Sequence, residues 1–151
     1  MGNPMTRDFD IIYQGVIYSK KNSKQIVKDA TGRPRIISNA KAREMEHDMI
    51  QQFHSQMPLI GLEHQIYMTQ TERILACKDH ARTYTIEATI WNPNNIRRDL
   101  DNQITSLLDG MVQAGVLPDD CSTIVTSIKA TFGGVDRINP RAEIHITEAS
   151  E

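Results

Sequence analysis

The sequence has few cysteines and no long apolar run, and both absences limit what the chain can be. Its two cysteines, Cys77 and Cys121, lie far apart among 151 residues, which fits neither a disulfide framework nor the spacing of a zinc site. No stretch approaches the roughly 18 apolar residues of a membrane span, and residues 1–10, MGNPMTRDFD, lack the apolar centre of a signal peptide. We therefore expect a cytoplasmic protein without a membrane partner.

Length and charge narrow the class further. A chain of 151 residues is about the size of one domain, so we expect residues 1–151 to form a single domain. The formal net charge of −2 argues weakly against a nucleic-acid partner. However, eight basic residues and one acidic residue lie between Ser19 and Arg43. Such an excess suits a phosphate backbone, with a solvated charged face as the alternative.

Hydrophobic periodicity and turn residues predict an α+β fold. Strands are expected at residues 9–19, 82–93, 122–132 and 142–147, and amphipathic helices at 38–57 and from about 102 to Gly115. Residues 20–37 read as a basic loop or ribbon with a turn at TGRP, and residues 59–81 are undecided between helix and strand. With the undecided region 59–81 leaving the middle of the chain uncertain, we expect the order β-α-β-β-α-β and a small mixed sheet covered by two main helices.

Two aspartates separated by one residue, Asp99 and Asp101, precede Asn102 at the start of the second predicted helix. An oxygen at a helix start accepts hydrogen bonds from free backbone N–H groups, and negative charge complements the helix dipole. One aspartate would meet that need, whereas two in an extended approach point to one side and could share a cation. The segment therefore indicates a helix start capped by Asp101 or Asn102, a metal site at the two aspartates, or both in one geometry.

A second acidic pair, Asp119 and Asp120, follows the same helix. Turn residues surround it in LPDDC, so a plain turn is the alternative to a functional role. Three or four carboxylates facing one point would repel one another unless a cation compensated them, and hard oxygen ligands suit Mg²⁺ or Mn²⁺. The chain must double back along a helix of roughly 20 Å for the two pairs to meet.

These segments together resemble a known family. RRDLDNQITSLLDGM at residues 97–111, LPDD at 117–120, and the basic SKKNSKQIV and TGRPRIISNAKAREME are similar to the RusA family of Holliday junction resolvases, which phages and prophages commonly carry. The similarity extends over residues 9–147 in the order of its parts. Its most specific portion is the combination of Asp-x-Asp-Asn, the later Leu-Asp within the helix, and the Asp-Asp after the helix.

The resemblance implies a RusA-like homodimeric endonuclease that depends on Mg²⁺, with Mn²⁺ also possible, and cuts two opposed strands of a four-way DNA junction. Its host compartment would be the cytoplasm of a bacterial or phage-infected cell. The catalytic and metal-binding acids of the family motif fall on Asp99, Asp101 and Asp120. Asn102 and Asp119 would support them.

One position departs from the family pattern. A lysine usually follows the motif asparagine by three residues, where it could neutralise phosphate charge, but this sequence has Thr105. Arg97, Arg98 or Lys129 would then have to replace that lysine. The alternative is a junction-binding protein of the same fold that cuts slowly or not at all. Asp109, which matches the acid within the helix, has either a structural or a catalytic role.

DNA contacts are expected from the basic segment and from residues beside the acids. The seven predicted contact residues are Lys20, Lys21, Lys24, Arg33, Arg35, Arg97 and Arg98. Phosphate contacts of this kind position DNA without reading its sequence. A two-fold dimer would place one site on each opposed strand of a junction, which itself has approximate two-fold symmetry. A third hypothesis is a sugar-nucleotide transferase, but the chain lacks a nucleotide-binding fingerprint.

Overall fold

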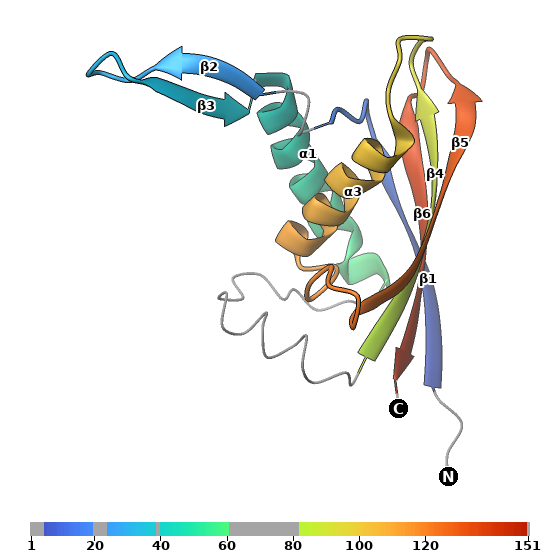
Figure 1. The fold of residues 1–151 in the computed structure, drawn as a ribbon. Coiled ribbons are helices and arrows are strands. Elements are labelled where there is room, and N and C mark those ends of the chain that lie inside the picture. The colour runs from blue at the N-terminus through green and yellow to red at the C-terminus, as the bar shows by residue number, and fades with distance from the viewer. Residues whose placement is uncertain (1–4, 20–23, 39, 61–81, 151) are drawn as a thin grey trace.

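A computed structural model describes residues 5–19, 24–38, 40–60 and 82–150, and the mixed α+β architecture expected from the sequence is confirmed (Figure 1). The order of helices and strands differs from the expected β-α-β-β-α-β: in the described residues it is β-β-β-α-β-α-β-β, because the basic segment forms two strands of its own and two strands follow the second helix. Four strands form one sheet in the order β1-β6-β4-β5, and two more form a separate hairpin, β2-β3. The bounds of the main sheet are β1 Met5–Gln14, β4 Arg82–Asn92, β5 Val125–Val135 and β6 Arg141–Ser150. The sheet is mixed because β6 runs antiparallel to both neighbours while β4 and β5 are parallel.

Two helices, α1 (Ala40–Gln56) and α3 (Leu100–Ala114), pack on one face of this sheet (Figure 1). Alternate residues of the strands point into the layer between the sheet and the helices, as the fully buried Ile86 and Ile90 of β4 illustrate. The helices supply Phe53, Met111 and other side chains with almost no exposed area. Each fully buried apolar side chain contributes about 1.5–3 kcal/mol relative to exposure, so this layer is the core that fixes the helices on the sheet.

The helix α3 ends where the sequence predicts. Gly115 adopts a left-handed φ of 85° and its N–H caps the carbonyls of Met111 and Val112, a conformation that glycine accepts without a Cβ penalty. The helix begins slightly earlier than predicted, at Leu100, with Asp99 at the N-cap position in an extended conformation. The Asp99 carboxylate is therefore fixed at the junction between the loop that follows β4 and the first turn of α3.

The strand β5 is longer than the sequence indicates, since residues 133–135 were expected to lie in a loop. Gly133 lies under the indole of Trp91 on β4, and a Cβ there would be 2.5 Å from Trp91 Cε2. Its lack of a side chain allows pairing to continue past a register shift between Ile90 and Trp91. Two adjacent glycines usually indicate a loop, but here the first of them allows two strands to pack closely.

The predicted basic loop or ribbon is a ribbon: β2 (Lys24–Lys28) pairs antiparallel with β3 (Pro34–Ser38). A short 3₁₀ turn, η1 (Pro58–Ile60), follows α1, and the rest of the undecided 59–81 region lies outside the described residues. Among the described residues, no helix is long and apolar enough to cross a membrane.

Cys121, in the segment between α3 and β5, is disulfide-bonded. The sequence did not predict this bond. Distance along the chain does not limit how closely two cysteine Cα atoms approach in the fold, so spacing alone could not have revealed the bond.

Candidate active site

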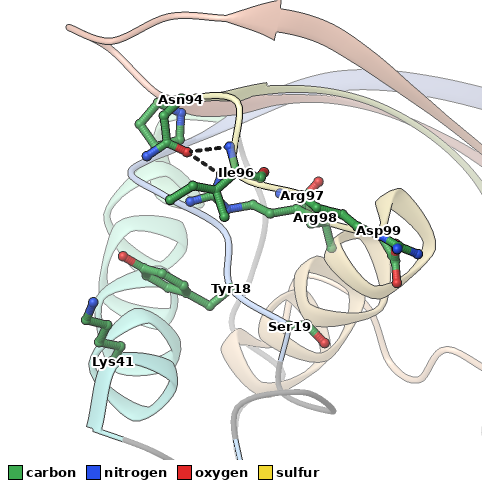
Figure 2. A pocket seen from close by; sticks show the side chains of 10 residues that line it. Tyr18, Ser19, Lys41, Asn94, Ile96, Arg97, Arg98 and Asp99 are labelled. Atoms are coloured by element: carbon green, nitrogen blue, oxygen red, sulfur yellow. Dashed lines mark hydrogen bonds and ion pairs between the residues drawn. The ribbon is translucent and has the colours of Figure 1, made fainter.

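An open pocket of about 630 Å³ lies at the N-terminal end of α3 (Figure 2). Its walls come from the segment after β1, the first turn of α1, the loop after β4, and the start of α3. The lining residues are Tyr18, Ser19, Lys41, Pro93, Asn94, Ile96, Arg97, Arg98, Asp99 and Gln103. We call it the α3 pocket. It contains three of the predicted functional residues, Asp99, Arg97 and Arg98.

Buried polar side chains on α3 hold the pocket walls together. The amide nitrogen of Gln103, only 1% exposed, donates to Asn92 Oδ1 at 2.8 Å and to the carbonyl of Ile17 at 3.2 Å. The hydroxyl of Ser106 donates to the carbonyl of Tyr18 at 2.9 Å. Sequence reasoning missed these positioning residues, although the signal was present: they are polar side chains on the apolar face of an amphipathic helix.

Asp99 occupies the N-cap position, yet its side chain makes no capping hydrogen bond. Its Oδ1 lies 3.6 Å from Nε of Arg97 in an ion pair whose side chains are 46% and 91% exposed, respectively. An exposed pair of this kind contributes little to stability. The carboxylate therefore faces the pocket without serving the helix.

Asp101 and Asn102 were predicted as possible caps, and neither holds the N-cap position. The exposed carboxylate of Asp101 accepts a hydrogen bond from the backbone N–H of Asn102 at 2.9 Å. This contact lies within the first turn of α3, where negative charge complements the helix dipole. Asp99 and Asp101 thus lie together at the start of the helix, with only Asp99 among the residues that line the pocket.

Three cationic side chains, those of Arg97, Arg98 and Lys41, line the same pocket as Asp99. Arg98 is held in place because its Nη1 donates to Asn94 Oδ1 at 2.9 Å and to the carbonyl of Ile96 at 3.2 Å. Lys41, at the start of α1, lies with its Nζ 5.9 Å from the centroid of the Tyr18 ring, and Figure 2 shows the two side chains together on one side of the pocket. Three cations and one acid thus line a site open to solvent, which suits a phosphate group.

The second acidic pair lies at the opposite end of α3. Partial burial raises the pKa of Asp120, and the hydrogen bond and charge of Asp119 and the charge of Asp109 raise it further. Asp109 follows Asp101 by eight residues, roughly 12 Å along the helix axis. Within the described part of the chain, no three His, Cys, Asp or Glu side chains are close enough to share a metal ion. The predicted meeting of the two acidic pairs therefore does not occur among the described residues of a single chain.

Two candidate replacements for the missing family lysine line the α3 pocket, and the third does not. Arg97 and Arg98 are pocket residues, whereas Lys129 pairs across the sheet with Glu87, on the face turned away from the helices. Thr105 itself is exposed, and its hydroxyl donates to the carbonyl of Asp101 at 2.9 Å. The hydroxyl of Thr105 is thus used in a hydrogen bond within α3, and the side chain adds no charge to the pocket.

Three of the remaining predicted DNA contacts, Lys24, Arg33 and Arg35, belong to the hairpin. Arg33 and Arg35 are exposed on its turn and on β3. Lys20 and Lys21 lie outside the described residues, as does the side chain of Lys24. Lys41 was counted in the basic segment without being assigned to a site, and only the fold reveals that it lines the pocket.

With this geometry established, comparison with known proteins identifies the class. A family model described as Endodeoxyribonuclease RusA matches residues 15–147. The chain therefore belongs to the RusA family of endodeoxyribonucleases, which implies Holliday junction resolvase activity in general and branched DNA as the partner. Among individually curated proteins, none matches the chain.

Proposed function

We propose that this protein is a divalent-metal-dependent endonuclease that resolves four-way DNA junctions by cutting two opposed strands. The observation that carries the proposal is the α3 pocket, where the exposed carboxylate of Asp99 lies among Arg97, Arg98 and Lys41. Cations of this kind bind a phosphodiester and compensate the charge that builds up during hydrolysis. In this proposal the working compartment is the cytoplasm of a bacterial or phage-infected cell.

The acids proposed for catalysis and metal binding are Asp99, Asp101 and Asp120, supported by Asn102 and Asp119. Their oxygen donors suit Mg²⁺, or Mn²⁺ in its place, and a bound ion would activate water and polarise the phosphate. One described chain does not gather three of them. The full set therefore requires a second copy of the chain, and the residues of one copy are assigned only to binding and orienting the phosphate.

The edge strand β5 offers the surface for that second copy. Ile128 and Phe132 are 45% and 54% exposed, although their β4 partners Ile86 and Ile90 are fully buried on the same face of the sheet. The core layer thus continues onto β5 without being covered there. An exposed edge strand with apolar side chains favours strand pairing with another chain.

Pairing two β5 strands about a two-fold axis makes them antiparallel, and this geometry would bring the separated acids together. Asp119 and Asp120 precede the start of β5, whereas Asp99 follows the end of β4, which runs parallel to β5. In an antiparallel pair, the start of one β5 lies beside the end of the other. The Asp119–Asp120 end of each chain would then approach the Asp99–Asp101 end of its partner, giving two sites per dimer.

The first test is cleavage of a labelled synthetic four-way junction with Mg²⁺, with junction binding recorded in the same samples. Wild-type protein should produce paired nicks, and Asp101→Asn should bind the junction but cut at least about 100-fold more slowly. Asp48→Asn, a matched change on α1 away from the pocket, should leave cleavage unchanged. Paired nicks by Asp101→Asn at the wild-type rate would overturn the assignment of the acids.

A second candidate function is favoured by Thr105, which stands where the family usually has a lysine. A protein with the same fold and binding surface would then hold junctions while cutting weakly or not at all. Tight junction binding with no cleavage by wild-type protein, in either Mg²⁺ or Mn²⁺, would select this function.

A further inference from the structure

We propose that the β2–β3 hairpin is a preformed arm that grips the duplex leading into the α3 pocket, and that Asp29 maintains its shape. This inference rests on the proposed function and assigns to the hairpin a task separate from strand cleavage. We call residues 24–38 the arm. Figure 1 shows it projecting away from the sheet and from the helices, as a ribbon attached at its base.

The charge distribution makes this segment the part of the chain that attracts DNA. Residues 19–43 hold eight basic residues and one acidic residue, a net charge of +7. The rest of the chain, with nine basic and eighteen acidic residues, carries −9. A body with that charge repels a polyanion, so the long-range attraction of DNA must depend largely on the basic segment.

Residues that line the pocket flank the arm in the sequence. Ser19, before β2, and Lys41, just after β3, both line the α3 pocket. The arm therefore extends from the pocket rim, and a strand held in the pocket would continue as duplex along it. A two-stranded ribbon fits the major groove of DNA, and a five-residue strand extends about 17 Å, enough to follow the groove beyond the site of cleavage.

The turn of the arm is closed by the one acidic residue in the segment. Asp29 Oδ1 accepts hydrogen bonds from the N–H of Thr31 at 2.9 Å, from its hydroxyl at 2.6 Å and from the N–H of Arg33 at 2.9 Å. Gly32, with φ 81°, donates its N–H to the carbonyl of Asp29 at 3.0 Å. These bonds fix the turn before DNA arrives and so lower the ordering cost of binding.

An exposed apolar side chain lies at the centre of the arm. Ile26 is 73% exposed and stands two positions before the exposed Lys28 on β2. Alternate residues share one face of a strand. That face therefore places an aliphatic side chain beside a lysine, which suits DNA: a lysine reaches phosphates while aliphatic groups contact the bases in a groove.

Two substitutions at Asp29 distinguish binding that depends on the shape of the arm from binding that depends on its positive charge alone. Asp29→Asn and Asp29→Ala remove the same negative charge, but only asparagine keeps a side-chain acceptor for the turn. If charge alone mattered, both variants would bind DNA more tightly than wild type. We expect Asp29→Asn to bind a four-way junction at least as tightly as wild type and Asp29→Ala to bind about 3–10-fold more weakly. Equal or tighter binding by Asp29→Ala would overturn the proposal.

The basic residues of the arm are tested through salt dependence. Changing Lys28, Arg33 and Arg35 together to glutamine should reduce the slope of log Kd against log salt by about 2–3, because each lost phosphate contact reduces it by about 0.9. An unchanged slope would overturn the proposal.

The partner of the apolar face is DNA in this proposal, and Ile26→Ser tests that choice. It should weaken junction binding about 3–10-fold while light scattering shows the same oligomeric state as wild type. A change to smaller assemblies would assign the face to a second copy of the chain and overturn the proposal.

Failure of the arm proposal is distinguishable from failure of the proposed function. If wild-type protein neither binds nor cuts junctions, the proposed function fails and the arm proposal fails with it. If wild-type protein binds and cuts while the arm variants behave like wild type in every assay, only the arm proposal fails.

Discussion

The two ends of α3 carry similar acids in opposite surroundings. At the N-terminal end, Asp99 lies in an open pocket among Arg97, Arg98 and Lys41. At the C-terminal end, partial burial and then the neighbouring Asp119 and Asp109 raise the pKa of Asp120. The first end suits binding of a phosphate, while the second suits a cation or a proton that relieves carboxylate repulsion. Neither end alone holds the complete set of groups that the proposed hydrolysis needs.

The strongest test of this division mixes two inactive variants. If each site takes Asp101 from one chain and Asp120 from the other, a mixed dimer of Asp101→Asn and Asp120→Asn contains one intact site. After random exchange of subunits, about a quarter of the wild-type number of intact sites should return, and junction nicking should reappear from two proteins that are each inactive. Cleavage assays on the separate and mixed variants measure this. Mixtures as inactive as their components would show that the ends of α3 do not complement one another.

The same comparison depends on β5 as the contact between copies. Phe132→Glu places a charge on the apolar face of this strand and should weaken self-association at least about 100-fold, since burying an unpaired charge costs several kcal/mol. Light scattering over a concentration series provides the measurement, and junction cleavage should fall with the dimer. Thr131→Glu, a matched change on the opposite face of β5, should leave the dimer intact. Equal dissociation of both variants, or of neither, would reject this interface.

The role of the N-terminal end of α3 can be tested by restoring the positive charge of the lysine that the family usually has at position 105. Thr105→Lys places a cation on the exposed side of α3, one turn after Asp101, and should raise junction cleavage about tenfold, corresponding to about 1.4 kcal/mol of transition-state stabilisation. Thr105→Gln controls for size and for loss of the hydroxyl contact, and should leave the rate close to wild type. Single-turnover cleavage separates this effect from binding, and equal rates for the two variants would show that Arg97 and Arg98 already supply the charge.

The smallest expected effect is on the thermal stability of the protein and concerns Asp120, at the C-terminal end of α3. A raised pKa means that the folded state disfavours the charged form of Asp120, so folding is less stable above that pKa than below it. Asp120→Asn should therefore raise Tm by about 1–2 °C at pH 7, a small shift because the group is largely solvent-screened. The gain should vanish at pH 3, where aspartate is protonated in both states. Thermal unfolding at both pH values gives the answer, with Asp101→Asn as a control that should show no gain.

Much of the fold was predictable because it follows from periodicity. The apolar spacing of Ile104, Leu107 and Met111 predicted α3 and its face, and the αL glycine at 115 predicted its end. The extension of β5 through Gly133 was not predictable, because it depends on the indole of Trp91 from another strand. Local sequence encodes elements well, whereas close packing between strands appears only in the assembled sheet.

The candidate site was predictable in part for a similar reason. Asp99, Arg97 and Arg98 are adjacent in sequence, so their common position in the pocket was expected. The contributions of Lys41 and Tyr18 depend on how α1 and the segment after β1 meet α3, which spacing does not record. The distance between Asp101 and Asp120 also depends on tertiary structure, and the prediction that the chain doubles back to join them fails among the described residues of one chain.

The stacked indole near the end of β4 has a practical consequence. Trp91 is the single tryptophan of the chain, and the guanidinium of Arg141 lies over its ring with Cζ 4.1 Å from the centroid. Trp91 is followed by Asn92, which holds Gln103, and then by the loop that lines the pocket. Its emission is therefore an intrinsic optical reporter with which the proposed binding of DNA or Mg²⁺ near the pocket can be tested in unlabelled protein.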